Sequence, residues 1–113
     1  MEEYGERDLC QVTGLLNMMQ FMRHASAHLQ DAATGPLTFM YFDLENFKSF
    51  NQRYGFRHGN RLLRYVADLL REIFEGDLVA RLNDDHFAVA TQNENPGDCI
   101  QFVHERIRVY DMG

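Results

Sequence analysis

The sequence predicts an α+β fold in which a small sheet carries helices on one or both faces. The apolar run Leu37–Leu44 has the length of a buried strand. Two further short apolar segments, Leu78–Leu82 and Phe87–Thr91, are separated by polar turn residues and predict a hairpin. Elsewhere the apolar residues recur every three or four positions, which is the spacing of amphipathic helices. The expected order is therefore helix, strand, two helices, hairpin, helix.

Length, composition and charge limit the classes of protein. A chain of 113 residues with 45% hydrophobic residues is one domain or part of one. Its net charge of −6 argues against a nucleic-acid partner. No segment approaches the roughly 18 apolar residues that would span a membrane, and the acidic N-terminus is not a secretory signal. Because Cys10 and Cys99 form no metal-binding spacing, we expect a reducing, cytoplasmic location without membrane contact by this segment.

Residues 1–30 are expected to form an N-terminal segment and a helix that leads into the domain. Apolar residues recur at spacings of three and four between Asp8 and Leu29, which predicts an amphipathic helix or a turn followed by one. His24 and His28 stand four residues apart and could share a metal ion. Because the glutamate and the third ligand of a zinc motif are missing there, a solvated polar face is favoured.

The strand Leu37–Leu44 has no polar face, so it is expected to be covered on both sides. Asp43 lies at its end and has two interpretations, which the strand and helix pattern leaves even. A carboxylate at the carboxyl end of a central strand is well placed to hold a hard cation. An aspartate is also a good N-cap, here for a helix that starts near Glu45.

Two helices are predicted to follow this strand. Residues 46–54 form a short one, and residues 61–74 form the longest apolar stripe of the chain, which is assigned to the core. Gly55 and Gly59 are expected to bracket a turn between the helices, with Asn60 as the N-cap of the second. Gly76 is expected to end that second helix.

The predicted hairpin turns through Asn83-Asp84-Asp85-His86. Asparagine and aspartate tolerate the positive φ angles that a tight hairpin demands. Two adjacent aspartates form either a solvated turn or an acidic cluster for a cation, and position alone favours the turn. After a loop with proline and glycine, Cys99–Val109 is expected to be a helix whose inward residues are Ile100, Val103 and Ile107.

Four motifs in order resemble those of the GGDEF domain of diguanylate cyclases. They are VTGLLN at 12–17, YFDLENFKSFN at 41–51, YGFRHGN at 54–60 and RLNDDHF at 81–87. The resemblance covers nearly the whole chain and implies a nucleotide-cyclase-like sheet with a ferredoxin-like βααββα core. It identifies residues 1–113 as a single, partial GGDEF domain that lacks the family's C-terminal strands. An unpaired edge of the first strand would then invite self-association.

The resemblance implies a chemistry for the carboxylates. The family condenses two GTP molecules into cyclic di-GMP across a dimer, with divalent metals that hold the triphosphate and favour the alkoxide. By similarity, Asp43, the backbone carbonyl of Leu44 and Asp85 would bind Mg²⁺ or Mn²⁺. Asp85 would also be the catalytic residue that assists deprotonation.

The resemblance also implies nucleotide contacts, for which Lys48 would lie near the phosphates and Asn51 and Asn60 would read guanine. Asn60 replaces an aspartate that accepts hydrogen bonds from guanine, and an amide offers only one acceptor oxygen. Asn83 and Asp84 replace two glycines and add bulk, and Asp84 adds negative charge beside a triphosphate. Lost partners of buried polar groups cost about 1–3 kcal/mol each, so several losses should remove most GTP affinity.

The sequence therefore predicts a degenerate GGDEF domain of a bacterial cyclic di-GMP signalling protein. It is expected to be catalytically inactive, with a regulatory, dimerisation or nucleotide-sensing role. Two alternatives stay open: a residual diguanylate cyclase or Mg-GTP-binding domain, and a protein-interaction scaffold. The expected partners are GTP and either a second copy or an attached sensor or output domain.

Two further substitutions in the family motifs carry expectations of their own. Phe74 replaces the arginine of the family's product-inhibition motif, which argues against feedback binding of cyclic di-GMP at 74–77. His86 replaces the second acid of the signature. Beside Asp43 and Asp85, its imidazole would turn a hard-cation site toward a softer metal such as Mn²⁺ or Zn²⁺.

Overall fold

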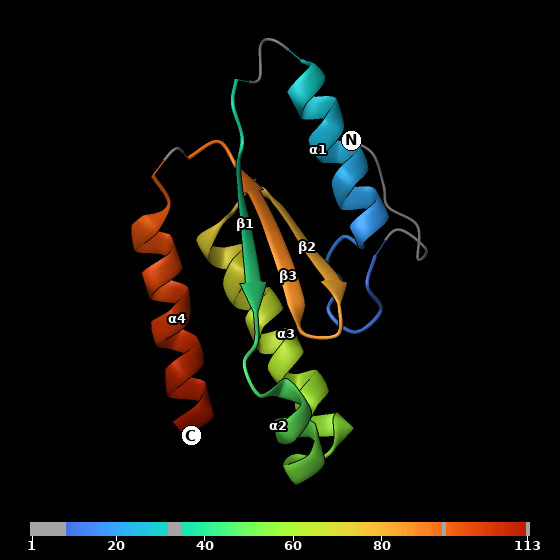
Figure 1. Cartoon of the computed structure of the whole chain (residues 1–113), viewed down its shortest axis with the longest axis vertical. Helices are drawn as coiled ribbons and strands as arrows, with labels where there is room; N and C mark the ends of the chain where they lie inside the picture. Colours follow the sequence, from blue (N-terminus) through green and yellow to red (C-terminus); the bar gives the residue numbers. More distant parts are fainter. Residues whose placement is uncertain (1–8, 32–34, 94, 113) are drawn as a thin grey trace.

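The computed structural model describes residues 9–31, 35–93 and 95–112 as helices packed on a three-stranded antiparallel sheet (Figure 1). The elements are α1 (Met18–Gln30), β1 (Thr38–Asp43), α2 (Phe47–Tyr54), α3 (Phe56–Ile73), β2 (Leu78–Asn83), β3 (His86–Thr91) and α4 (Gly97–Met112). Their order confirms the predicted α+β fold. No helix in the described ranges is both long enough and apolar enough to cross a membrane.

The strand order is β1-β3-β2, and β3 pairs antiparallel with both neighbours. The hairpin β2-β3 therefore lies beside β1, although the two are separated along the chain by α2 and α3. In this register Thr38 is opposite Thr91 and Asp43 is opposite His86. Because β1 pairs on one side only within the described sheet, it is an edge strand and not a central one.

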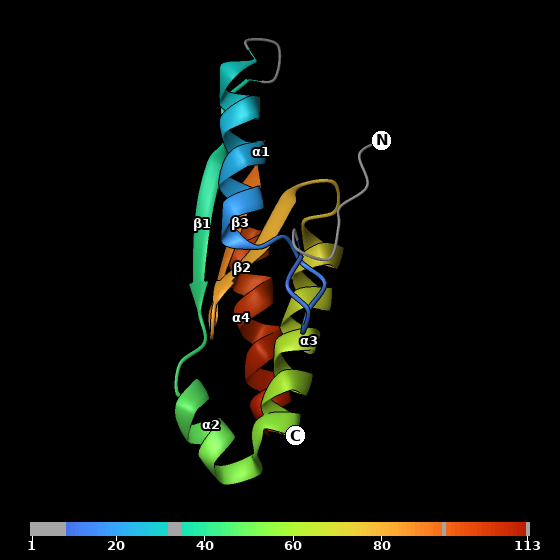
Figure 2. The ribbon, with the colours of Figure 1, turned by 90° about the vertical axis from the view of Figure 1, so that its right-hand side faces the viewer.

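One face of the sheet carries the main core, under α3 and α4 (Figure 2). Each strand directs alternate residues to this face, as the two-residue period of a strand requires. The strand residues in this core are Met40, Phe42, Val79, Phe87 and Val89. They pack with the apolar stripe of α3 and with Val103, which is fully buried on α4. The expected inward face of the last helix is confirmed, because Ile100 and Ile107 also pack on this core.

The opposite face is covered only in part, by α1. Phe21 of α1 packs with the small residues Ala80, Ala88 and Ala90 of β2 and β3. The side chains of Phe39 and Tyr41 on β1 lie on the same face, but they are 51% and 61% exposed. The expectation that the first strand is covered on both sides was therefore wrong. Its physical reason is that α1 lies along β2 and leaves the outer edge of the sheet open.

Residues 9–30 are a turn followed by a helix, which was one of the two predicted forms, and residues 1–8 of the predicted N-terminal segment lie outside the described residues. Asn17 is the N-cap of α1, and its Oδ1 accepts a hydrogen bond of 2.9 Å from the backbone N–H of Gln20. Of the helix residues, Phe21 and Ala25 are buried, whereas Met19 is 75% exposed. The apolar spacing predicted the helix correctly but overestimated the width of its buried face.

The predicted turn between Gly55 and Gly59, with Asn60 as an N-cap, was wrong. Helix α3 begins at Phe56, so residues 56–60 are helical and Gly55 itself is the N-cap, at φ 89°. A single glycine in this conformation reverses the chain without a longer turn. Gly59 is needed for a different reason, because a Cβ there would overlap the side chain of Asn51 on α2.

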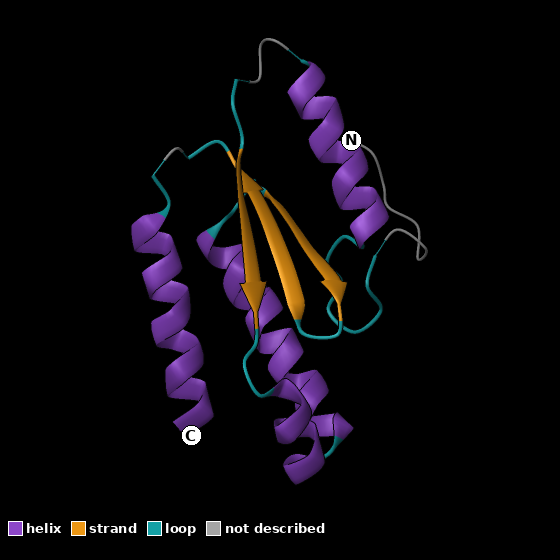
Figure 3. Ribbon diagram, viewed as in Figure 1, coloured by secondary structure: helices purple, strands orange, loops and turns teal. Residues whose placement is uncertain are grey.

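A tight turn joins β2 and β3 (Figure 3), but its backbone differs from the expectation. None of its residues has positive φ, and within the described residues Asn46 alone among non-glycines has it. The register shifts between Arg81 and Asn83, and the guanidinium of Arg81 donates to the carbonyl oxygen of Asp84 from Nε at 3.0 Å and Nη2 at 2.7 Å. The chain thus reverses through a strand irregularity and the hydrogen bonds from Arg81, and not through residues with left-handed backbone.

Candidate functional site

The end of β1 and the tip of the hairpin bring three metal-ligating side chains together. His86 Nε2 lies 3.4 Å from Asp43 Oδ1 and 3.5 Å from Asp85 Oδ1. One ligand atom from each of the three residues lies within 4.8 Å of the others. Asp43 and His86 are direct cross-strand neighbours, and the two-residue turn adds Asp85. Asp43 and Asp85, which are far apart in the sequence, therefore lie close together.

Backbone hydrogen bonding holds Asp85 beside the end of β1. The N–H of Leu44 donates to the carbonyl oxygen of Asp85 at 3.0 Å, which continues the β1-β3 ladder beyond Asp43. Asp43 does not cap the following helix, because the N-cap of α2 is Asn46, which has left-handed backbone and no side-chain capping bond. The capping interpretation of Asp43 is therefore wrong, and the cation interpretation remains.

His86 is held in a defined orientation within this cluster. Its Nδ1 contacts Oδ1 of Asn83 across the base of the turn, and the ring of Tyr41 lies 5.3 Å away between centroids. An amide oxygen only accepts hydrogen bonds, so Nδ1 is the donor and Nε2 faces the carboxylates. The side chains of Asp85 and His86 are 25% and 30% exposed, and that of Asp43 is 57% exposed. Solvent can therefore reach the cluster.

A pocket of about 630 Å³ opens between α2 and the hairpin tip. Lys48 and Asn51, from α2, line it together with Asp84 and Asp85. The structure thus brings two of the three predicted nucleotide-contacting residues to the pocket that Asp85 lines. Asn60 is not among the described residues that line it. Among the described residues that line this pocket, Lys48 is the one cationic side chain, and Asp84 and Asp85 supply two carboxylates.

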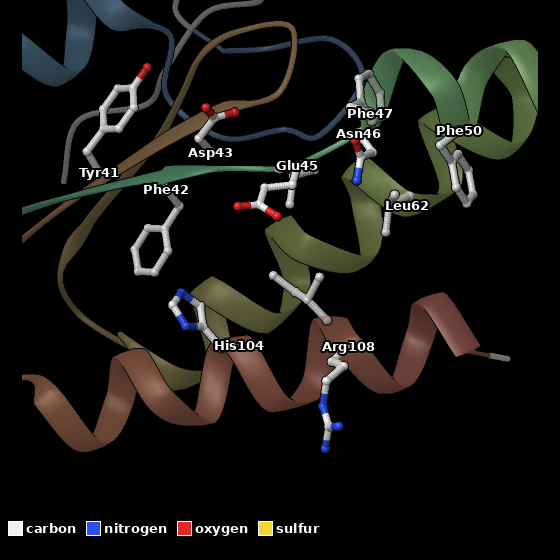
Figure 4. A pocket seen from close by; sticks show the side chains of 12 residues that line it. Tyr41, Phe42, Asp43, Glu45, Asn46, Phe47, Phe50, Leu62, His104 and Arg108 are labelled. Atoms are coloured by element: carbon white, nitrogen blue, oxygen red, sulfur yellow. The ribbon is translucent and has the colours of Figure 1, made fainter.

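A second pocket, of about 420 Å³, lies on the other side of β1, between the strand end and α4 (Figure 4). Phe42, Glu45 and His104 point toward it, whereas Asp43 and Tyr41 point to the opposite side of the strand. Sequence reasoning did not identify His104 as a residue that lines this pocket. No local signal could have shown it, because α4 is brought beside the strand end by packing in the main core.

The hairpin is also tied to the N-terminal turn through Arg81. Its Nη1 lies 3.3 Å from Sγ of Cys10, while its other nitrogens hold the carbonyl of Asp84. Burial raises the pKa of the Cys10 thiol, but hydrogen bonds from Thr13 and from Arg81 outweigh this effect and hold the pKa below its ordinary value. The thiol was not singled out from its spacing, and only the fold reveals its arginine neighbour.

The position of Phe74 bears on the motif at 74–77. Its side chain is 3% exposed and belongs to the main core, where its ring lies 6.4 Å from that of Phe42. The residue that stands at the arginine position of the family motif is therefore a packing residue in this chain.

Comparison with known proteins identifies a family model and several relatives that match this chain. The family model described as "Diguanylate cyclase, GGDEF domain" matches residues 8–110. The chain is 40% identical over 77 residues to a probable diguanylate cyclase, DgcF of Escherichia coli, which covers 66% of this chain and 24% of that protein. It is 37% identical over 86 residues to the cyclic di-GMP phosphodiesterase PdeR of the same organism, over 73% of this chain and 13% of that protein. The chain thus spans less than a third of either relative.

A solved structure shows the same arrangement of elements. The GGDEF domain of TpbB from Pseudomonas aeruginosa superposes with a TM-score of 0.73 at 31% sequence identity. The match covers 88% of this chain and 59% of that one. The sheet with its packed helices is therefore the arrangement of a known domain structure.

Proposed function

The chain belongs to the GGDEF family of diguanylate cyclase domains, and from this premise we propose that it is a catalytically silent member with a regulatory role in a cyclic di-GMP signalling protein. One observation carries the proposal. The pocket that Lys48, Asn51 and Asp85 share is also lined by Asp84, which stands at a glycine position of the family signature.

Asp84 opposes nucleotide binding through its charge. Two like unit charges 4 Å apart repel by about 1 kcal/mol in water and about 4 kcal/mol near a protein surface. One carboxylate beside a triphosphate can therefore lower affinity by up to roughly a thousandfold. Lys48 alone offsets this repulsion among the described lining residues. Asn83 adds bulk to the turn where the family has a second glycine.

The metal and nucleotide roles of the site are part of the proposal. Asp43, Asp85 and the backbone carbonyl of Leu44 would hold the divalent ion, whose chemistry is to neutralise phosphate charge and favour an attacking alkoxide. Lys48 would contact the phosphates. Asp85 would assist deprotonation only if turnover occurs.

A nucleotide-sensing form of the same role is favoured by a specific observation. Lys48 and Asn51 line one pocket with Asp85, so the residues that we propose for the phosphate and guanine contacts would lie together although the signature has changed. Asn60 does not line this pocket, and we assign it no contact in this form of the role. The domain would then bind Mg-GTP without converting it.

The setting of the domain follows from its relatives. Proteins named as a cyclase and as a phosphodiesterase both share this region, and each is several times longer than the match. We infer that residues 1–113 act as one partial GGDEF domain in the cytoplasm, beside a sensor or output domain or a second copy. Residues 1–30 would connect it to such a neighbour.

The test is a cyclase assay on the chain with GTP and either Mg²⁺ or Mn²⁺, combined with calorimetric titration of GTP. We expect no cyclic di-GMP and weak binding at most. The variant Asp84→Gly should raise GTP affinity at least tenfold, because it removes the charge and restores the small residue. Measurable turnover by the unaltered chain would refute catalytic silence, and unchanged affinity in Asp84→Gly would refute the reason given for it.

A further inference from the structure

We propose that Asp43, Asp85 and His86 together form a three-ligand site whose imidazole gives it a preference for Zn²⁺ over Mg²⁺. This inference rests on the proposed metal position at Asp43 and Asp85. It goes beyond that proposal by adding a nitrogen ligand and by changing the class of ion from a hard cation to a transition-metal dication. Imidazole suits zinc and its neighbours, whereas carboxylate, carbonyl and water suit Mg²⁺.

The two distances between His86 and the carboxylates match those between two ligands of one zinc ion. Two ligands bound to one ion at 2.0–2.2 Å in a tetrahedral arrangement lie roughly 3.3–3.6 Å apart. His86 Nε2 lies 3.4 Å from Asp43 Oδ1 and 3.5 Å from Asp85 Oδ1. Both distances exceed the 2.7–3.2 Å of a good N–H···O hydrogen bond. His86 Nε2 is therefore separated from each carboxylate as one ligand of an ion is from another, and one ligand atom of each of the three residues lies within 4.8 Å of the others.

The neighbour of His86 supplies the outer contact that metal-binding histidines have. Such a histidine usually donates its other ring N–H to a carboxylate, a carbonyl or water, which fixes the ring and directs the free nitrogen at the ion. Here Nδ1 contacts the side-chain oxygen of Asn83. Asn83, which replaces a glycine of the family signature, thus orients His86, which replaces an acid. The substitution at position 83 therefore supports the one at position 86.

The backbone around the cluster restrains all three ligands. Asp43 and His86 are paired across the β1-β3 ladder, and the Leu44 N–H to Asp85 carbonyl bond holds the turn against the strand end. Arg81 clamps the carbonyl of Asp84 from the other side of the hairpin. Three protein ligands leave a fourth position of a tetrahedral ion open to water or to a ligand.

The experiment compares metal affinities of the intact chain and of two variants at His86. Calorimetric titrations with ZnCl₂ and with MgCl₂ give the ratio of the two affinities. His86→Gln should weaken Zn²⁺ binding at least tenfold, with little effect on Mg²⁺. His86→Glu, which supplies a third carboxylate, should tighten Mg²⁺ and narrow the Zn²⁺/Mg²⁺ ratio at least tenfold. Asn83→Ala should weaken Zn²⁺ about tenfold by releasing the ring.

The matched control is His28→Gln, because His24 and His28 on α1 stand four residues apart, a spacing at which two histidines can share a metal ion. Zn²⁺ affinity should be unchanged in this variant. Zn²⁺ binding that survives His86→Gln, or that is lost in His28→Gln, would overturn the proposal, as would an unchanged ratio in His86→Glu. These outcomes are separate from the cyclase assay, since a silent domain can bind Mg²⁺ alone and an active one can bind Zn²⁺.

Discussion

The two faces of β1 are similar in sequence but have opposite surroundings. Met40 and Phe42 are 9% and 7% exposed in the core under α3, whereas Phe39 and Tyr41 are 51% and 61% exposed on the other side. Each face carries large apolar side chains. The difference shows that hydrophobicity determines which residues are able to enter a core, whereas the positions of the helices determine which ones do.

The alanines of β2 and β3 explain where the second face is covered. Ala80, Ala88 and Ala90 form a flat surface on which Phe21 of α1 packs. Phe21 makes an edge-to-face contact with Phe39 of β1, at 6.5 Å between ring centroids. The open part of the face adjoins His86, whose ring Tyr41 flanks. An uncovered face therefore gives solvent and ions access to the cluster at the strand end.

The largest expected effect comes from truncating the covered face. Phe42→Ala should lower the free energy of unfolding by about 3–5 kcal/mol, because it opens a cavity beside Phe74. The matched change on the open face, Phe39→Ala, should cost less than about 1 kcal/mol, since its side chain is half exposed. Urea denaturation of both variants measures the contrast. Equal costs would mean that the open face is covered in solution, for example by a second copy.

In the helices over the covered face, stability should be sensitive to a side chain at Gly59. Gly59→Ala is expected to destabilise the fold by about 1–3 kcal/mol, because its Cβ would overlap Oδ1 of Asn51. That oxygen is buried without a hydrogen-bond partner in the described structure. Thermal unfolding measures the loss.

A double mutant tests this explanation. Asn51→Gly removes the overlapping side chain and should recover most of the stability that Gly59→Ala loses, relative to Asn51→Gly alone. Additive losses in the double mutant would show that the two positions do not contact each other.

On the partly covered face, a larger side chain under α1 should lower the stability of the fold. Ala80→Leu is expected to cost about 1–3 kcal/mol, because Ala80 is fully buried in the cluster with Phe21. The exposed position Arg61 on α3 offers a control, since Arg61→Leu should change stability by less than about 0.5 kcal/mol. Chemical denaturation distinguishes the two. A neutral Ala80→Leu would mean that α1 does not pack closely on β2.

The smallest effect on stability is expected at the border of this face, where Arg81 Nη1 lies 3.3 Å from Sγ of Cys10. Because the pKa of the Cys10 thiol is lowered in the folded state, its contribution to stability is present above the unfolded pKa and is lost as pH falls through the folded value. The pH profile of Cys10 alkylation, read by mass spectrometry, should have its midpoint below that of a free cysteine peptide.

Arg81→Gln removes one of the hydrogen bonds that lower this pKa and should move the midpoint upward. The same change releases the Asp84 carbonyl, so it should also weaken metal binding at the hairpin tip. A midpoint that does not change would show that the hydrogen bonds from Thr13 and Val12 account for the lowered pKa without Arg81.

Much of the fold could be predicted because its signals are local. The 3.6-residue spacing over 61–74 and the short apolar segments around Asp84-Asp85 correspond to α3 and to the hairpin. The errors occurred where two elements meet. Gly55 and Gly59 predicted a turn on their own, but packing against Asn51 makes Gly59 part of a helix.

The candidate site was predictable in its carboxylates but not in its geometry. Asp43 could be singled out by its position after a strand, whereas Asp85 was identified only through the resemblance of 81–87 to the family signature. Whether they approach each other depends on the β1-β3 register, which a one-residue slip would destroy. The contact between Asn83 and His86, and the absence of Asn60 from the described pocket lining, likewise needed coordinates.

The sequence by itself determined the class of fold, the order of the elements, the family and the residue types available for a cation and a nucleotide. These properties depend on spacing along the chain, where near neighbours carry the information. The tertiary structure alone decided that β1 is an edge, that Phe39 and Tyr41 are exposed, and that Asp43, Asp85 and His86 lie within ligand distance. The reason is that contacts between distant segments depend on how helices and strands share one core, and that competition for burial has no local signature.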